Sequence, residues 1–515
     1  MRYWPASLDF VNELLTQDTR CLISILVVGW LLASRVLIGQ SVAAEGNPQN
    51  PPPSPPRQIR LGGWTVAGNL RLRFEDWDFF KTQAGDVDGD YGYGASLLRL
   101  SISRQFQSKD WFFELAQPSL IGLPSHAIAP PPQGQLGFGG TYFAANPDRT
   151  VGILLKQAFI RFKGIGGDQP SNLRLGRFEF GDGLEMTPES PLGTIIRDRV
   201  ANRLIGNFGF THVGRSLDGV HFSRSVPATN FTLVAARPTE GVFQVKGMNE
   251  LNVDIVYGAL TRTIRSLGDG QGRIFATYYR DGRDVLKTDN RPLPFRSEDH
   301  KKIGIMTIGG NYVNVSDAGI GKADVLFWGT AQIGAWGELS HRANAVAVEA
   351  GYLFDKTRFQ PWVRTGYFRG SGDDDPSDGT HRTFFQELPT PRPFARFPIY
   401  NLMNNEDAFA QFTLNPNRKW TVRSEAHWLN LTSAKDLWYV GGGAFQKQSF
   451  GYTGRPSGGQ RRFAVVLDLS ADYQLDSQTT LTFYAAHAGG KGVVRNLFPD
   501  GRNANLVYIE ATRRF

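Results

Sequence analysis

Residues 462–475 read R-F-A-V-V-L-D-L-S-A-D-Y-Q-L, and the recurrence of this pattern along the chain decides the fold class. One set of alternate positions is apolar throughout, namely Phe463, Val465, Leu467, Leu469, Ala471 and Tyr473. Most positions between them are polar, and a period of two is typical of a strand with one apolar face. At roughly 12 residues it is longer than the ~5–6 of a usual globular strand and closer to the ~9–11 of a tilted membrane-spanning strand. Taken alone, the stretch also fits a long strand in a soluble sandwich.

The same alternation returns many times between Trp64 and the C-terminus. The predicted strands are 64–74, 95–106, 110–117, 154–162, 172–180, 216–225, 228–237, 250–261, 271–281, 300–314, 322–335, 342–354, 358–370, 405–414, 419–432, 461–474, 478–489 and 503–515. The even number, eighteen, favours a bacterial barrel whose two ends lie on the same side of the membrane.

The connections between the predicted strands alternate in length. Short turns are expected at 107–109, 226–227, 355–357, 415–418 and 475–477. Long links are expected at 75–94, 118–153, 181–215, 371–404 and 433–460, although 336–341 is short where a long one would fit. Outer-membrane barrels have short periplasmic turns and long extracellular loops. The sequence therefore predicts an all-β, transmembrane, antiparallel up-and-down barrel of eighteen strands in the bacterial outer membrane.

The N-terminal part of the chain differs from the rest. Residues 1–44 resemble an export signal, with an apolar core at 22–33 and small residues before Glu45. An uncleaved anchor is the alternative, but the apolar core is too short to span a bilayer. The only cysteine, Cys21, lies in this segment, so the mature chain offers no disulfide or thiolate nucleophile. Residues 45–62 are predicted to form a proline-rich tether, and 63–515 the barrel.

Several short motifs carry a resemblance to a known family. They are L-R-L-G-R at 173–177, R-S-L-D-G-V at 215–220, G-Y-F-R-G-S-G-D at 366–373 and the terminal R-F. In this order and spacing the chain resembles the alginate-export family of outer-membrane porins, from about Trp64 to Phe515. The resemblance implies a monomeric eighteen-stranded barrel with a cation-rich pore that passes a uronate polymer outward.

Arginine suits such a pore because it is always charged and can donate two parallel hydrogen bonds to a carboxylate. By alternation, Arg71, Arg99 and Arg161 are predicted to face the lumen. Arg177 lies opposite Phe178 and Phe180, although Leu173 and Leu175 then share its side. The resemblance places basic pore residues at Arg71, Arg99, Lys156 and Arg369. Lys156 and Arg369 reach the lumen only if the local register shifts.

The sequence also departs from the family pattern. Glu179 stands where family members can carry a second basic residue, and the strand at 479–489 lacks an expected pair of arginines. Asp468 is a predicted inward carboxylate. The alternative to an anion path is that inward arginines and carboxylates neutralise one another across the lumen.

No other site is favoured. The acidic loops at 86–90 and 373–378 suggest at most incidental calcium, because the glutamate of a helix–loop–helix calcium site is missing. The histidines are scattered, and no phosphate loop or G-x-S-x-G motif occurs. The sequence predicts no enzyme activity, no metal and no cofactor. The net charge of +8 does not indicate nucleic acid, since the strand pattern and the export signal place the chain elsewhere.

The leading hypothesis is an outer-membrane channel that passively exports an anionic polysaccharide. A general or anion-preferring uptake porin and a structural barrel with a closed lumen remain alternatives. The expected partners are the polysaccharide, outer-membrane lipid and lipopolysaccharide, and periplasmic export proteins. The terminal Phe515 suggests recognition by the barrel assembly machinery. The barrel is expected to be a monomer.

Overall fold

The computed structural model describes residues 59–390 and 396–515. The predicted export signal and residues 45–58 of the predicted tether lie outside the described residues. The last residues of that tether form the short strand β1 (Ile59–Leu61), which pairs with the start of the first barrel strand. No helix within the described residues is both long and apolar enough to cross a membrane.

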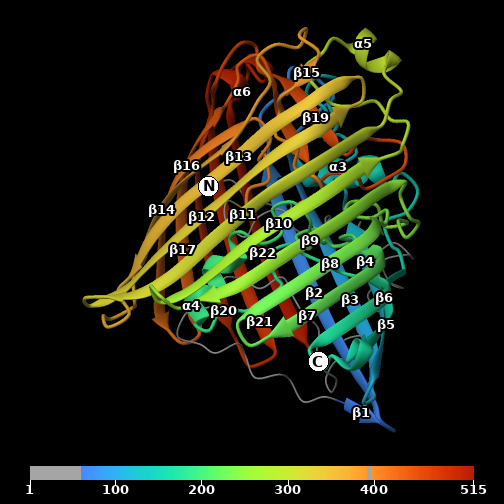
Figure 1. Cartoon of the computed structure of the whole chain (residues 1–515). Helices are drawn as coiled ribbons and strands as arrows, with labels where there is room; N and C mark the ends of the chain where they lie inside the picture. Colours follow the sequence, from blue (N-terminus) through green and yellow to red (C-terminus); the bar gives the residue numbers. More distant parts are fainter. Residues whose placement is uncertain (1–58, 391–395) are drawn as a thin grey trace, which may run out of the picture.

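Eighteen antiparallel strands form one closed barrel (Figure 1). They are β2 (Trp64–Asp78), β3 (Asp90–Gln105), β4 (Lys109–Ile121), β5 (Leu154–Lys163), β6 (Ser171–Phe178), β7 (Leu217–Val226), β8 (Thr229–Pro238), β9 (Val253–Ile264), β10 (Asp269–Asp281), β11 (Ile303–Ala318), β12 (Gly321–Trp336), β13 (Leu339–Leu353), β14 (Trp362–Gly370), β16 (Asn405–Asn417), β17 (Trp420–Leu431), β20 (Arg462–Gln474), β21 (Thr479–Gly490) and β22 (Asn503–Arg514). Pairing of β22 with β2 closes the barrel. Each predicted strand corresponds to one of these, so the predicted fold class is confirmed.

The remaining elements lie in the connections. A two-residue strand, β15 (Thr380–His381), pairs with β13, and β18 (Leu437–Gly441) and β19 (Tyr452–Pro456) form a separate hairpin. The helices are α3 (Gly137–Ala145), η2 (Ile165–Gly167), α4 (Pro191–Asp198), α5 (Leu293–Glu298) and α6 (Gly492–Leu497). The long connections occupy one end of the barrel, and only Gly337 and Glu338 join β12 to β13.

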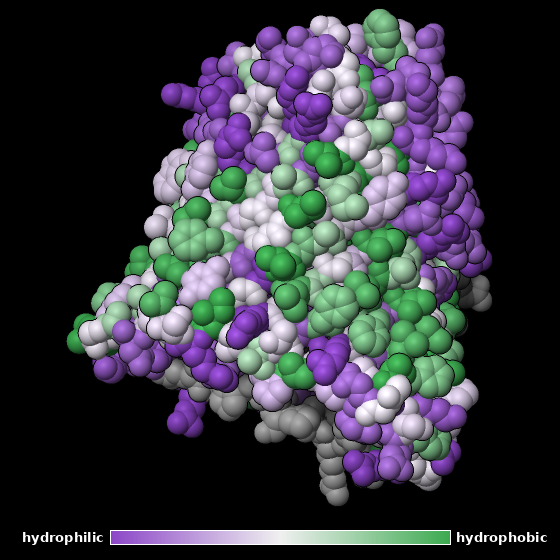
Figure 2. Space-filling model, viewed as in Figure 1, coloured by the Kyte–Doolittle hydropathy of each residue, from purple (hydrophilic) through white to green (hydrophobic). Residues whose placement is uncertain are grey.

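The alternation of side chains sorts each strand into an outer and an inner face. On β20, Leu467 and Leu469 are 53% and 51% exposed, whereas Val466 and Asp468 between them are buried. Large apolar side chains are exposed in the same way on other strands, which is the surface that contacts lipid in an outer-membrane barrel. Figure 2 shows hydrophobic residues gathered over the strands and hydrophilic ones concentrated beyond their upper ends.

One end of β20 departs from the simple alternation. A register shift in the β17–β20 pairing leaves Phe463 without a partner, so that Asn430 pairs with Arg462. Phe463 is fully buried and packs 4.7 Å from the ring of Trp438, which lies in β18. The prediction that Phe463 shares the outer face with Val465 is therefore wrong, because a bulge turns its side chain inward.

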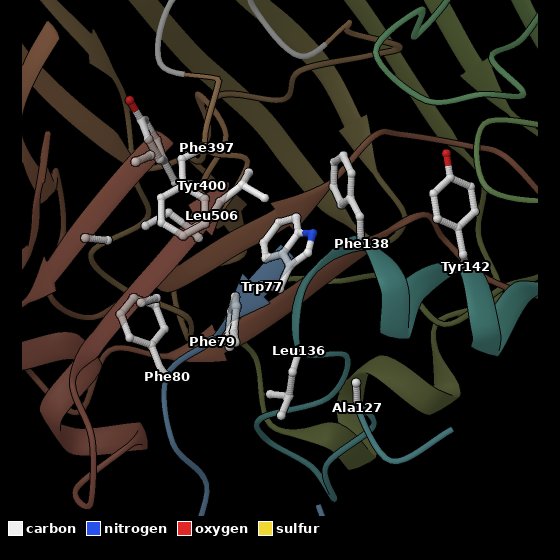
Figure 3. Close-up of a cluster of buried hydrophobic side chains, with 14 of the residues drawn as sticks. Trp77, Phe79, Phe80, Ala127, Leu136, Phe138, Tyr142, Phe397, Tyr400 and Leu506 are labelled. Atoms are coloured by element: carbon white, nitrogen blue, oxygen red, sulfur yellow. The ribbon is translucent and has the colours of Figure 1, made fainter. Parts of the chain in front are cut away.

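An aromatic cluster joins the extracellular connections to the inner wall of the barrel. Trp77, at the end of β2, packs 6.0 Å from the ring of Phe138 in α3 and 5.7 Å from that of Phe397 (Figure 3). Leu136 and Tyr142 come from the same connection as Phe138, and all are buried. These contacts fix the long connections to the barrel wall and to one another.

Candidate functional site: the charged lumen

The connection between β6 and β7, residues 179–216, folds into the lumen and touches both sides of the barrel wall. It is called the inner loop below. On one side, Arg71 of β2 donates to the carbonyl oxygens of Gly209, at 2.7 Å, and Thr211. On the other side, Arg199 contacts Glu349 of β13. Because β2 and β13 lie far apart around the sheet, the inner loop spans the lumen.

A four-residue charge cluster lies where the inner loop begins. Arg99 of β3 donates to Glu114 of β4, with Nε 3.0 Å from Oε1, and its Nη2 lies 2.8 Å from Oε2 of Glu179. Lys156 Nζ lies 3.5 Å from Oε1 of the same Glu179. All four side chains are largely buried. Glu179 therefore neutralises part of the positive charge that Arg99 and Lys156 bring to the wall.

Lys156 reaches the lumen through a register shift. Glu114 pairs with Gln157 and Leu115 pairs with Leu155, which leaves Lys156 as the extra residue of a β-bulge. Its ammonium donates to the carbonyl oxygens of Val213, at 2.9 Å, and Arg215, at 3.1 Å. The bulge is the local register shift that Lys156 needs in order to face the lumen.

Two more arginines face the lumen nearer the periplasmic end, where β5 and β6 pair. Arg161 and Arg174 are cross-strand neighbours. Arg161 Nε donates to Asp110 at 2.8 Å, and its side chain remains 38% exposed. The Arg174 guanidinium lies 4.6 Å from the ring centre of Phe159. Among the described residues, no carboxylate lies within ion-pair distance of Arg174.

Arg174 was missed in the sequence although a signal for it was present. It lies between Leu173 and Leu175 in the L-R-L-G-R motif, and Leu175 is exposed on the outer face. Because successive side chains of a strand point to opposite faces, an arginine placed between two leucines of the outer face is expected to point inward.

The register corrects two predicted pore residues. Arg177 shares the outer face with Leu175, and its guanidinium forms two 2.6 Å hydrogen bonds with Asp218 of β7. Arg369 shares the outer face with the exposed Val363 and Tyr367. The pairings of β14 contain no register shift that would turn Arg369 inward. Both arginines lie at the extracellular ends of their strands.

Asp468 faces the lumen and belongs to a buried polar network of the opposite wall. It accepts a hydrogen bond from Tyr484 at 3.0 Å. Nearby, His427 contacts Asp407 at 2.9 Å and Glu425 at 3.3 Å. These inward carboxylates are therefore hydrogen-bonded by side chains of the same wall.

Glu349 of β13 anchors the inner loop. Its carboxylate lies 2.5 Å from Arg199 Nε, 3.2 Å from Arg203 Nη2 and 3.1 Å from Nη2 of Arg364, which comes from β14. All four side chains are almost fully buried. One carboxylate thus holds two arginines of the inner loop and one of the wall.

The connection 371–404 also enters the lumen. Glu387 accepts hydrogen bonds from Thr277 at 3.0 Å and Thr307 at 2.8 Å, both from the barrel wall. The amide of Leu388 donates to Leu204 of the inner loop at 2.7 Å, and Gly206 donates back to Leu388 at 2.8 Å. The two connections therefore support one another inside the barrel.

A cavity of about 790 Å³ opens among the extracellular connections. Its lining includes the cationic side chains Arg291, Arg296 and Lys435 and the aromatic Phe450 and Tyr452. Arg291 is paired with Asp289 and Asp299, at 2.9 Å each, whereas Lys435 is exposed. Two smaller cavities, of about 170 and 40 Å³, lie among the connections. No group of three His, Cys, Asp or Glu side chains within the described ranges is arranged to hold a metal ion.

A pair of buried carboxylates, Asp373 and Asp436, lies among the extracellular connections. The backbone amide of Asp373 donates to Asp436 at 2.9 Å. Burial, with the nearby Asp436, raises the pKa of Asp373 to about 7, and burial raises the pKa of Asp436 to about 6. Asp378 adds to the first shift, and Arg382, 3.9 Å from Asp373, opposes it.

We expect this packing to weaken as the pH rises. Between the ordinary aspartate pKa of 3.8 and about 7, folded Asp373 keeps a proton that the unfolded chain has lost, so stability falls across this window. After correction for the intrinsic base-catalysed rise of exchange with pH, the amide protection factors of residues 371–390 should be lower at pH 8 than at pH 5. Asp373→Asn should remove most of the difference, and an unchanged difference in that variant would contradict the assignment.

The comparisons with known proteins agree with this geometry. The family model described as alginate export matches residues 147–490, which is more than half of the chain. No curated protein matches the sequence. Two solved structures from Pseudomonas aeruginosa share the fold. OpdK, crystallised with vanillate, has a TM-score of 0.52 and 7% identity over 87% of this chain and 98% of its own. OccK9 (OpdG) has a TM-score of 0.53 and 10% identity over 88% and 98%.

The matched region includes Lys156 and Glu179 of the charge cluster, the inner loop and most of the barrel strands, whereas Arg99 and Glu114 precede it. The two solved structures share the barrel fold, which agrees with the closed sheet of this chain. The chain therefore belongs to the alginate-export family and is a β-barrel channel of the bacterial outer membrane.

Proposed function

We propose that this channel passively exports an anionic polysaccharide, an alginate-like polyuronate, along a wall that carries basic side chains. The observation that carries the proposal is the set of inward-facing cations on the neighbouring strands β2, β3, β5 and β6. They are Arg71, Arg99, Lys156, Arg161 and Arg174. Family membership supports the same direction of transport.

The arrangement suits a charged polymer that must keep moving. Each sugar of a polyuronate carries a carboxylate, and a lumen of low polarity would exclude it without matching cations. Inside the barrel such cations are screened less than at the surface, so they raise the local concentration of a polyanion. Conduction also requires that each site release its ligand.

The wall carboxylates provide that release. Arg99 already contacts Glu114 and Glu179, and Arg161 contacts Asp110. A passing uronate therefore exchanges with a built-in partner, and its net gain at each position is small. Arg174, which has no carboxylate partner among the described residues, is the strongest single position for an entering uronate.

A general or anion-preferring uptake porin is the second candidate. It is favoured by the inner loop and the connection 371–404, which meet inside the lumen through the paired backbones of Leu204 and Leu388. A path narrowed in this way suits small solutes, and export of a polymer requires that one of these connections move.

Single-channel recording in a planar bilayer tests the proposal. Uronate oligomers added on the periplasmic side should cause transient blocks of the current at low salt. A neutral glucan of equal length should cause far fewer blocks, since it lacks carboxylates. The block frequency should fall as salt rises, because the Debye length contracts from ~30 Å at 0.01 M to ~3 Å at 1 M.

Equal blocking by the two polymers would reject the polyanion path and favour the general porin. As a matched control, Arg177→Gln removes an arginine from the outer face of the strand that carries Arg174. Uronate oligomers should block the current of this variant as often as that of the wild type. They should block the current of Arg174→Gln less often.

A further inference from the structure

The outer face of the barrel carries two rows of charged residues at the extracellular ends of the strands. The first crosses β6 to β10 and consists of Arg177, Asp218, Arg237, Asp254 and Arg280. The second crosses β14 to β20 and consists of Arg369, Glu406, Asn430 and Arg462. The two rows are called the balanced row and the basic row below.

Each row lies directly above lipid-facing side chains. One outward position below the basic row, the paired residues are Val348, Tyr367, Ala408, Trp428 and Val465. Tyr367 and Trp428 are exposed. Aromatic side chains form girdles at the two interfaces of an outer-membrane barrel. The basic row therefore lies at the level of the outer-leaflet headgroups.

The balanced row is neutral when Glu250, which contacts Arg237 from beside the row, is counted with it. Arg177 binds Asp218, Arg280 binds Asp254 at 2.5 Å, and Arg237 bridges Asp254 at 2.6 Å and Glu250 at 2.7 Å. Three arginines thus face three carboxylates. Nothing in this row is left to attract an anion.

The basic row has more cations than it can pair. Glu406 contacts both Arg369, at 3.8 Å, and Arg461, at 3.0 Å. These arginine side chains are 42% and 53% exposed. Arg462 is exposed, and among the described residues no carboxylate lies within ion-pair distance of it. Two arginines thus share one glutamate, and the third has no carboxylate within reach among the described residues.

The bulge at the end of β20 is what creates the row. By plain alternation Arg462 would face the lumen, but the register shift turns Phe463 inward and pairs Arg462 with Asn430. The same shift that completes the inner aromatic cluster therefore places an unpaired cation on the outer surface.

From these observations we infer that the basic row is a docking site for lipopolysaccharide, through the phosphate groups of lipid A. Guanidinium groups bind phosphate with two parallel hydrogen bonds, and the aromatic side chains below the row supply an apolar surface for the acyl chains. The site lies on one sector of the barrel, because the balanced row is already neutral.

Native mass spectrometry of the full barrel in detergent tests the inference. Bis-phosphorylated lipid A should remain bound to the wild type, and dephosphorylated lipid A with the same acyl chains should bind about tenfold less, equivalent to ~1.4 kcal/mol. Millimolar inorganic phosphate should not displace the lipid, since it lacks the acyl contacts. Equal binding of the two lipids would overturn the inference without any variant.

Variants separate the two rows. Arg369→Gln with Arg462→Gln should reduce occupancy by lipid A several-fold, whereas Arg237→Gln in the balanced row should leave it unchanged. Glu406→Gln should raise occupancy, because it removes the only carboxylate of the basic row. The unboiled gel mobility reports folding in each case. Equal losses from the two rows would show that general surface charge, rather than the basic row, holds the lipid.

Discussion

Glu349→Gln is expected to free the inner loop from the wall of the barrel and to raise the single-channel conductance several-fold. The carboxylate of Glu349 contacts Arg199, Arg203 and Arg364, and all four side chains are almost fully buried. Glutamine keeps the shape but removes the charge. Three buried guanidinium groups then share far less negative charge, and breaking a buried pair in this way costs about 3–5 kcal/mol.

The loss should appear at the inner loop first. Arg199 and Arg203 belong to this loop, whereas Arg364 belongs to β14. Arg364 keeps Asp324 at 3.2 Å, and Arg199 keeps the more distant Glu425 at 4.0 Å. The strand ladder on both sides of β13 is untouched. We therefore expect an assembled barrel with a larger, noisier current and a lower temperature of transition between the unboiled and boiled gel mobilities.

Glu406→Gln is the matched control for this prediction. Glu406 also contacts two arginines, but it lies on the outer face and those arginines are exposed. Surface pairs contribute at most about 1 kcal/mol, so stability and conductance should hardly change. Wild-type conductance in Glu349→Gln would show that the inner loop is held by its other contacts.

Arg174→Glu is expected to reduce the preference of the channel for anions at least about tenfold at low salt, which corresponds to ~1.4 kcal/mol. Arg174 and Arg161 are cross-strand neighbours, so their fields add in the lumen. Only Arg161 has a carboxylate partner, Asp110. The substitution changes the local charge by two units where no described carboxylate already compensates it.

The measurement is the reversal potential across a salt gradient. The effect should fade at 1 M salt, where the Debye length is ~3 Å. Arg177→Gln, three residues along the same strand, should leave the reversal potential unchanged because Arg177 faces outward. If both substitutions shifted the potential equally, the inward placement of Arg174 would be wrong as an explanation of selectivity.

The sequence determined the barrel, its eighteen strands and the segregation of long and short connections. This information is local, because a strand between lipid and lumen must alternate along its own length. Where the alternation is regular, the sequence also predicts whether an arginine points to the outer face or to the lumen. The inward direction of Arg174 could be inferred from its flanking leucines. The same rule indicates that Arg369 shares a face with Val363 and Tyr367.

Only the tertiary structure decided where the alternation fails and which charges meet. The bulges at Lys156 and Phe463 arise in the pairing with the partner strands β4 and β17. No residue type in β5 or β20 predicts them. Glu179 neutralises Arg99, which lies 80 residues earlier in the chain. A side chain's direction follows from its neighbours in sequence, but its partner follows from the neighbours that the closed sheet and the inner loop bring to it.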